Sequence, residues 1–200
     1  GSTKIQIDID PSSINKNVVV DDAIVGDVGP VLEDMIKVWK ARQVKPDRKA
    51  LDKWWKQIDE WRAIDSLKFK QSGDVIKPQH AIRRLYELTR GKKETFISTE
   101  VGQHQMWAAQ HFGFDKPNQW LTSGGLGTMG YGLPAAIGVQ MAHPDATVVD
   151  IAGEASIMMN IQELSTAVQY RLPVKVFILN NQYMGRSEER RVGKECTLRC

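Results

Sequence analysis

A carboxylate and two carboxamides follow two apolar runs in the second half of the chain. Glu154 comes directly after TVVDIAG at residues 147–153, and Asn180 and Asn181 come directly after VKVFIL at residues 174–179. Carboxylate and amide oxygens are hard ligands that suit Mg²⁺, which in proteins is commonly bound together with a phosphate. These residue types predict a site for a phosphate-bearing cation, provided that the fold brings the two positions together.

The segments around these residues predict a strand–helix–strand unit. Residues 147–151 and 174–179 are predominantly apolar and typical of buried strands. Residues 159–170 between them predict a helix that Pro173 ends, with apolar side chains at helical spacing at Ile161, Leu164 and Val168. Such a unit connects neighbouring parallel strands by a right-handed crossover, so both strands end at the same sheet edge. We therefore expect the carboxylate and the carboxamides to meet at a carboxyl edge, where open α/β sheets bind ligands.

The spacing of these residues resembles the thiamine diphosphate motif, a GDG triplet followed further along the chain by an NN pair. Here the motif reads Gly153-Glu154-Ala155 and Asn180-Asn181. Glu in place of Asp keeps a hard oxygen ligand but adds a methylene, which matters because Mg²⁺ tolerates little distortion. Ala in place of the last Gly requires a negative φ. The alternative is an ordinary Rossmann-like unit in which the acid and the amide cap turns.

The resemblance implies roles for the motif residues and their neighbours. In the thiamine diphosphate family the acid, the second Asn and a backbone carbonyl two residues later bind magnesium, which carries over to Glu154, Asn181 and Tyr183. The implied contacts to the organic cofactor in this region are Gly153, Glu154, Ala155, Ser156, Asn181, Tyr183 and Met184.

Two further segments extend the resemblance. VGQHQMWAAQHF at residues 101–112 and LTSGGLGTMGYGLPAA at residues 121–136 make residues 5–185 similar to an internal piece of the acetolactate synthase (acetohydroxyacid synthase) catalytic subunits. The resemblance implies that Gln103 and His104 lie at the diphosphate, near a helix N-terminus that offers N–H groups to an anion. It also implies that Met129, beside Gly127, holds the cofactor bent. Taken alone, the histidine is typical of an exposed helix position and the methionine of loop packing.

Two acidic turns near the N-terminus indicate a second cofactor. IDIDP at residues 7–11 and GDVGP at residues 26–30 resemble the segments of the family that touch the adenosine end of FAD. This implies FAD contacts at Asp8, Asp27 and Val28, with Asp8 accepting hydrogen bonds from ribose hydroxyls and Asp27 from a second polar group. The alternative for Asp8 is the outward face of an edge strand.

The predicted fold class is α/β. A Rossmann-like, parallel-sheet thiamine diphosphate-binding domain with helices on both faces follows the end of a central FAD-associated α/β domain and a helical linker. The predicted boundaries are residues 1–37 for the central domain, 38–77 for the linker and 78–185 for the cofactor domain. Residues 186–200, RSEERRVGKECTLRC, are predicted to be the translation of a sequencing adapter.

Helical periodicity also places three helices outside the motifs, at residues 31–42, 51–64 and 78–89. In the second of them Trp54, Ile58 and Trp61 recur at i, i+4 and i+7. We expect this tryptophan stripe to cover a core, since such a stripe is more typical of packing than of base stacking.

Composition excludes several classes of function. The net charge is +3, and the five basic and three acidic residues of segment 186–200 account for two of those charges, which gives no electrostatic case for nucleic acid binding. No apolar run is long enough to span a membrane, and no signal peptide is recognisable. Both cysteines, Cys196 and Cys200, lie in the same segment, so the rest of the chain is free of cysteine, as expected of a cytosolic protein without disulfides. The predicted localisation is the bacterial cytoplasm. A start at Gly1 without Met suggests a fragment.

The resemblance implies the function. Pyruvate would be decarboxylated and joined to a second 2-oxo acid, pyruvate or 2-oxobutanoate, to give 2-acetolactate or 2-aceto-2-hydroxybutanoate for branched-chain amino acid biosynthesis. The implied cofactors are thiamine diphosphate, Mg²⁺ and FAD. The implied partners are further catalytic subunits, in a dimer or tetramer, and a regulatory small subunit.

No catalytic residue is assigned to this sequence, because the activating glutamate of the family belongs to an N-terminal domain. We therefore expect the isolated chain to be inactive. The alternatives are another thiamine diphosphate-dependent decarboxylase or carboligase, a nucleotide-binding module without catalysis, and a truncated product without a function.

Overall fold

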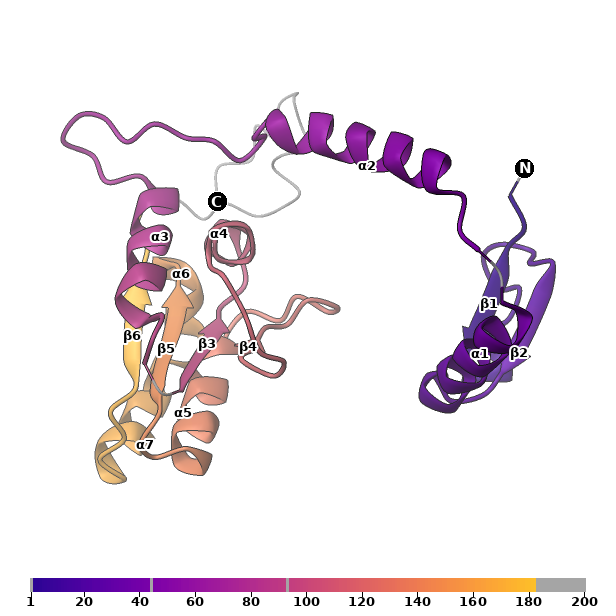
Figure 1. The fold of residues 1–200 in the computed structure, drawn as a ribbon. Helices are drawn as coiled ribbons and strands as arrows, with labels where there is room; N and C mark the ends of the chain where they lie inside the picture. Colours follow the sequence, from indigo (N-terminus) through magenta and orange to yellow (C-terminus); the bar gives the residue numbers. More distant parts are fainter. Residues whose placement is uncertain (1, 44, 93, 183–200) are drawn as a thin grey trace, which may run out of the picture. The chain divides into compact units, whose positions relative to one another are not determined.

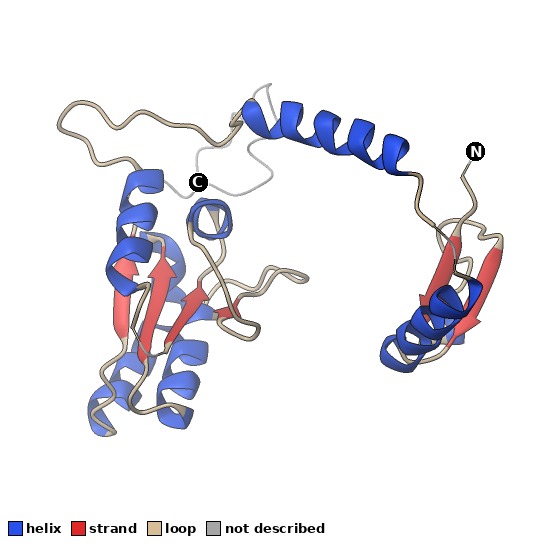
Figure 2. Cartoon of the chain, in the orientation of Figure 1, coloured by secondary structure: helices blue, strands red, loops and turns tan. Residues whose placement is uncertain are grey.

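The computed structural model describes residues 2–43, 45–92 and 94–182, which form two compact units, Gly1–Ser66 and Leu67–Cys200 (Figures 1 and 2). The predicted domain boundaries at residues 37, 77 and 185 stay predictions. Tyr183, Met184 and segment 186–200 lie outside the described residues, so the roles predicted for them stay predictions as well.

The first unit combines a two-stranded parallel sheet with two helices. Its elements are β1 (Ile5–Asp8), the short 3₁₀ turn η1 (Pro11–Ser13), β2 (Asp22–Val25), α1 (Val28–Arg42) and α2 (Arg48–Ala63). The strands pair in register from Ile5 opposite Asp22 to Asp8 opposite Val25. Both helices begin three residues earlier than the periodicity predicts. An aspartate caps each start, because Asp27 accepts from the backbone of Gly29 and Asp47 from that of Ala50.

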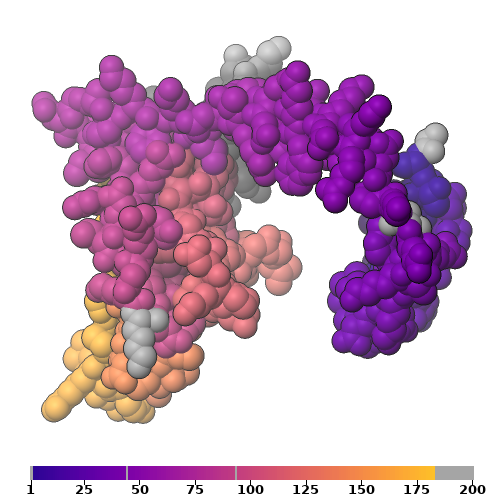
Figure 3. Space-filling model, in the orientation of Figure 1, coloured from indigo at the N-terminus to yellow at the C-terminus, as the bar shows by residue number. Residues whose placement is uncertain are grey.

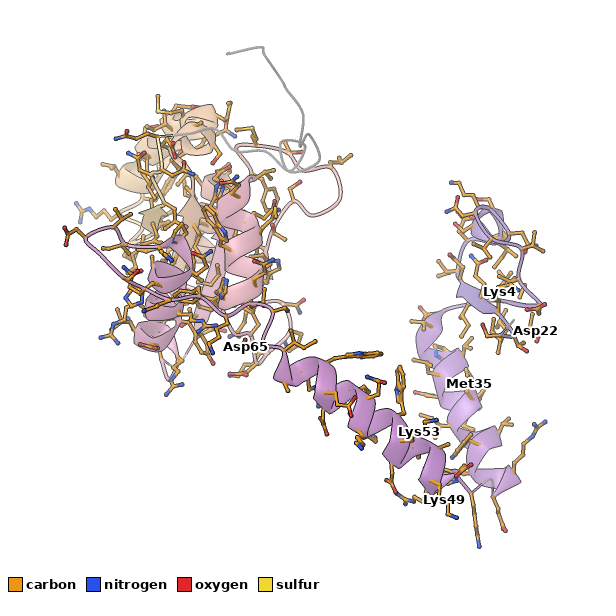
Figure 4. The ribbon with its side chains drawn as sticks, turned by 90° about the horizontal axis from the view of Figure 1, so that it is seen from above. Lys4, Asp22, Met35, Lys49, Lys53 and Asp65 are labelled. Carbon is orange, nitrogen blue, oxygen red and sulfur yellow. The ribbon has the colours of Figure 1, made fainter. Side chains whose placement is uncertain are left out.

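The apolar faces of these helices are exposed, which makes the prediction of a covered tryptophan stripe wrong. None of the described residues of α1 or α2 is buried, and Trp54 and Trp61 are 53% and 54% exposed. The two indole rings contact each other edge-on, with centroids 5.5 Å apart. Side chains project from the ribbon along both helices, Met35 on α1 and Lys53 on α2 among them (Figure 4). An amphipathic repeat shows which face can be buried and leaves open whether a partner lies in the same chain.

The second unit is built on a four-stranded parallel sheet in the order β4-β3-β5-β6. Its strands are β3 (Thr95–Thr99), β4 (Trp120–Leu121), β5 (Thr147–Ala152) and β6 (Lys175–Ile178). β5 pairs with β6 along four positions, from Val149 opposite Lys175 to Ala152 opposite Ile178. The predicted crossover between neighbouring parallel strands is therefore confirmed.

Helices pack on both faces of this sheet, as the fold class predicts. Ile97, Val149 and Ile151 form one core cluster with residues of α3 (Pro78–Thr89) and α4 (Gln103–His111). The alternating positions Phe96 and Val148 pack on the opposite face against α5 (Gly132–Ala142), since successive strand residues point to opposite sides. α3 has the predicted bounds, beginning at its proline.

The crossover from β5 to β6 is not the single helix predicted for residues 159–170. It consists of α6 (Glu154–Ile157), the 3₁₀ segment η2 (Met158–Glu163) and α7 (Leu164–Gln169). Asn160 breaks the regular geometry with φ −134° and ψ 31°. Its side-chain Nδ2 donates to the carbonyl oxygen of Gly130 at 2.6 Å. A tertiary hydrogen bond to the loop before α5 thus accompanies the break, which local periodicity cannot reveal.

Candidate functional site

The predicted metal ligands lie just beyond two neighbouring strand ends. Glu154 is the first residue of α6, two residues after the end of β5, and Asn181 follows the end of β6. The hydrogen bonding between these strands continues one residue beyond β6, because the Leu179 amide donates to the Ala152 carbonyl at 2.8 Å. The Asn180 side chain accepts from the backbone of Gln182 at 2.9 Å. The structure therefore brings Glu154 and Asn181 to one carboxyl edge of the sheet.

Gly153, His104 and Ser156 are packed together at this edge. A Cβ added at Gly153 would lie 2.7 Å from Nδ1 of His104, so only glycine fits between the ring and the turn. The Ser156 hydroxyl lies 3.4 Å from Nε2 of His104 and 3.2 Å from both the amide nitrogen and the carbonyl oxygen of Gly153. Ala155 lies within α6 and is not among the described residues of positive φ, which meets the condition for replacing glycine.

His104 is buried, contrary to the picture of an exposed helix histidine. It is the second residue of α4, directly after Gln103, and only 7% of its surface is exposed. Burial lowers the pKa of its imidazole to about 4, although the Glu100 backbone and the Glu154 carboxylate favour the charged form. The ring is therefore neutral at pH 7 and can donate one hydrogen bond and accept another.

The glycine-rich loop, residues 122–131 between β4 and α5, stands out from the second unit (Figures 1 and 3). Gly127 adopts a left-handed φ of 67°, which favours glycine. Gly127 and Met129 line a cavity of about 610 Å³ together with Val101, Gly102, Gln105, Met106, Ser123, Gly124, Gly125, Leu126 and Met159. The predicted loop residues thus share a cavity with the start of α4, whereas Gln103 and His104 are not among its lining residues.

Two buried carboxyls close to this loop were not predicted from the sequence as site residues. Glu100 and Asp150 are both 0% exposed. Burial raises the pKa of Glu100, and burial together with the charge of Glu100 raises the pKa of Asp150 to about 7. Asp150 had a signal in the sequence, since it interrupts an apolar strand. Glu100 had none, because its partners Gly130 and Leu133 are 30 and 33 residues away in the glycine-rich loop and α5.

The predicted FAD residues share the carboxyl end of the first unit's sheet. The Asp8 side chain accepts from the Asp10 backbone at 3.0 Å, and the Asp8 carbonyl accepts from Gly26 at 2.9 Å. Asp27 caps α1, which Val28 begins. Both carboxylates therefore have local structural roles, and their contact with a flavin nucleotide stays a prediction.

The donor set at the sheet edge fits Mg²⁺ better than a transition metal. Among the described residues no group of three or more His, Cys, Asp and Glu side chains is placed to hold a metal ion. One carboxylate, one carboxamide and backbone carbonyls are the oxygen donors that Mg²⁺ uses when phosphate and water complete its shell. In the described part of the chain no helix is both long and apolar enough to cross a membrane.

Known proteins share much of this sequence. Residues 100–193 match the family model "Thiamine pyrophosphate enzyme, C-terminal TPP binding domain". The chain is 51% identical to the acetolactate synthase isozyme 3 large subunit of Escherichia coli (strain K12) over 184 residues, 92% of this chain and 32% of that protein. It is 50% identical to the chloroplastic acetolactate synthase of Arabidopsis thaliana over 183 residues, 90% of this chain and 27% of that protein.

The chain spans about a third of the length of the bacterial relatives it matches. Because similar proteins also include a chloroplastic one, the predicted bacterial cytoplasm stays a prediction. The matched segment includes the glycine-rich loop and both motif halves, the same residues that the fold gathers at one edge of the sheet. Residues 100–193 therefore match the thiamine pyrophosphate enzymes, and most of the chain is similar to part of the acetolactate synthase large subunits of bacteria and plants.

Proposed function

We propose that this chain forms the diphosphate-binding part of an acetolactate synthase, which condenses pyruvate with a second 2-oxo acid. The observation that carries the proposal is the pairing of β5 with β6, which sets Glu154 and Asn181 at one sheet edge. Thiamine diphosphate supplies the chemistry that decarboxylates pyruvate and transfers the remaining two-carbon unit. The residues of this chain bind and orient it.

In this proposal the oxygens of Glu154 and Asn181 and the carbonyl of Tyr183 hold Mg²⁺. Because Glu154 opens α6 directly after Gly153, its extra methylene relative to aspartate can be taken up by the turn. Ser156, Ala155 and Met184 complete this side of the diphosphate site.

Gln103 and His104 approach the diphosphate from the start of α4. A neutral His104 donates a hydrogen bond to a phosphate oxygen while its second nitrogen stays within reach of Ser156. An anion next to the ring favours the imidazolium, so diphosphate binding is expected to raise the pKa of His104 from its low value.

Gly127 and Met129 bind the organic part of the cofactor in the cavity beside the glycine-rich loop. A cavity of about 610 Å³ suits a ligand of this size, and thioethers fill irregular apolar space well. Met129 is half-buried, so part of its side chain packs against the protein and part remains open to a ligand.

The remaining parts of the proposal concern the whole enzyme. Asp8, Asp27 and Val28 contact FAD, and the catalytic subunits form a dimer or tetramer with a regulatory small subunit. The acceptor is pyruvate or 2-oxobutanoate. No catalytic residue is assigned to this chain, so we expect no acetolactate from the chain alone.

Isothermal titration calorimetry of the full chain tests the binding role. We expect thiamine diphosphate to bind in Mg²⁺ and not in EDTA. Glu154→Gln removes the charged ligand and should abolish the Mg²⁺-dependent heat. Glu87→Gln is the matched control, since this exposed carboxylate of α3 pairs only with Arg84 among the contacts the structure describes. Binding that is indifferent to Mg²⁺, or equal affinity for ADP, would point instead to a generic nucleotide-binding module.

A further inference from the structure

Glu100 places a buried carboxylate directly under the glycine-rich loop. It follows β3 by one residue and lies on the same side of the strand as Phe96 and Ser98, the side that faces α5. Its Oε2 accepts from the amide of Gly130 at 2.6 Å, and its Oε1 accepts from the amide of Leu133 at 3.0 Å. One side chain of the sheet therefore holds the end of the loop and the start of the helix.

The start of α5 has no side-chain cap of its own. Its flanking residue Tyr131 makes no capping hydrogen bond, although the first N–H groups of a helix need acceptors and favour a negative charge. Glu100 supplies that acceptor from the neighbouring strand. Gly132 permits the approach, because a Cβ there would lie 2.6 Å from the Glu100 amide and would overlap Oδ1 of Asp150.

Gly130 is held from both sides. Glu100 binds its amide, and Asn160 of η2 binds its carbonyl at 2.6 Å. The residue has a left-handed φ of 86°, and a Cβ on it would lie 2.7 Å from Nδ2 of Asn160. The peptide groups on both sides of a left-handed residue are therefore fixed, and with them the point where the glycine-rich loop enters α5.

Burial raises the pKa of Glu100, and the backbone N–H groups of Leu133, Gly130 and Gly132 act against that rise. Asp150 Oδ1 accepts from the Ser98 hydroxyl at 3.2 Å, and its Oδ2 makes no hydrogen bond with any described residue. Burial raises the pKa of Asp150 to about 7, burial lowers that of His104 on α4 to about 4, and α5 carries no titratable side chain. The carboxylate with backbone donors is that of Glu100.

We propose that Glu100 is a positioning residue for the cofactor: its carboxylate caps α5 and fixes Gly130, and thereby sets where Gly127 and Met129 stand in the cavity. What the loop binds rests on the proposed function. The hold of Glu100 on the loop is a property of the chain without cofactor, so it can be tested separately.

Amide hydrogen exchange of the full chain without cofactor, resolved by NMR, is the direct test. Glu100→Gln removes the charge and one acceptor, so exchange at Gly130 and Leu133 is expected to accelerate at least tenfold. Asp150→Asn is the matched control, a buried carboxyl of the same neighbourhood without backbone donors from the loop, and should leave both amides within about threefold. The Ile151 amide reports global opening and normalises all three proteins.

Unchanged exchange at Gly130 and Leu133 in Glu100→Gln, or equal acceleration in Asp150→Asn, would overturn the proposal. If Glu100→Gln does not fold, the wild-type chain still decides. The ¹³C shift of the Glu100 carboxyl and the ¹H shifts of the Gly130 and Leu133 amides are followed over pH. They should titrate together, and amide shifts that ignore the Glu100 titration would contradict the proposal.

Calorimetry with thiamine diphosphate and Mg²⁺ then connects the loop to binding. Glu100→Gln is expected to bind at least tenfold more weakly than Asp150→Asn, although neither residue lines the cavity. If the wild-type chain binds no thiamine diphosphate while the exchange results hold, the proposed function fails, and what stands is the hold of Glu100 on Gly130 and Leu133. If the wild type and Glu100→Gln bind thiamine diphosphate equally well, cofactor binding does not depend on the hydrogen bonds of Glu100 to the loop. That result would overturn the positioning role for the cofactor.

Discussion

The two units of the chain use similar apolar patterns with different results. In the second unit Ile97, Val149 and Ile151 are buried between the sheet and its helices. In the first unit Leu32, Met35, Ile36, Trp39 and the α2 tryptophans stay about half exposed. Helix α3 of the second unit has the same helical period as α1 and α2, yet it buries Ile82 against the sheet. What differs is therefore the presence of a facing layer among the described residues. An amphipathic repeat therefore identifies an apolar surface, and whether that surface is buried depends on an element that faces it.

Substitution of an apolar side chain should change the free energy of unfolding far more in the second unit than in the first. Ile97→Ala removes a fully buried side chain and should lower the free energy of unfolding by about 2–5 kcal/mol. Trp54→Ala removes a larger side chain that is 53% exposed, and should change it by less than about 1 kcal/mol. Urea unfolding followed by circular dichroism measures both. A tryptophan substitution as damaging as the isoleucine one would show that α2 is covered in solution.

A second prediction uses the buried carboxyl of the second unit. The folded pKa of Asp150 is raised from 3.8 to about 7, so between these values the unfolded state has lost the proton and the folded state keeps it. Stability therefore falls as pH rises from about 4 to 7, by on the order of 3 kcal/mol. Asp150→Asn should remove this fall.

His104 has the opposite slope. Its folded pKa is lowered from 6.5 to about 4, so the unfolded state takes up the proton first and stability falls as pH drops through this window. In Asp150→Asn the opposing contribution of Asp150 is absent, so stability should rise from about pH 4 to 6.5. Thermal denaturation over pH measures both, and identical pH profiles for the two proteins would contradict the assignment.

A third prediction contrasts the units by ligand. Thiamine diphosphate with Mg²⁺ at about 100 times its Kd should stabilise the second unit by about 2.7 kcal/mol. Hydrogen exchange should slow in β5 and stay unchanged in β1, because the proposed ligands lie at the end of β5. Equal slowing in both strands would mean that the units respond as one.

The smallest expected effect concerns helix caps. Asp47 caps α2, and Asp47→Ala should destabilise that helix by about 1 kcal/mol, visible as lost helicity because none of the described residues of α2 is buried. α3 has no side-chain cap, yet it buries Ile82 against the sheet. Its helicity should survive Lys77→Ala, a matched change at the flanking position. If Lys77→Ala lost helicity and Asp47→Ala did not, α3 and not α2 would be the helix that depends on its flanking residue.

Much of the second unit could be predicted from sequence because its signals are local. The proline at the start of α3, the apolar runs of β5 and β6, and the place of Glu154 and Asn181 at one sheet edge follow from residue type and spacing. The metal-binding role of these two residues stays a prediction. The broken crossover could not be predicted, since Asn160 satisfies its amide at Gly130, thirty residues away. Glu100 was missed for the same reason. Its role depends on donors that only the fold brings near.

Gly132 lies where three positions constrain one another. A side chain there would meet Asp150 and the backbone of Glu100, and losing Glu100 would leave the start of α5 without an acceptor. A larger side chain at position 132, or the loss of the acceptor at position 100, therefore disturbs the neighbouring positions, whereas the isosteric change Asp150→Asn does not. In a library of variants, a larger side chain at position 132 should be tolerated only together with changes at positions 100 and 150, so this corner of the protein is expected to accept such mutations only in combinations.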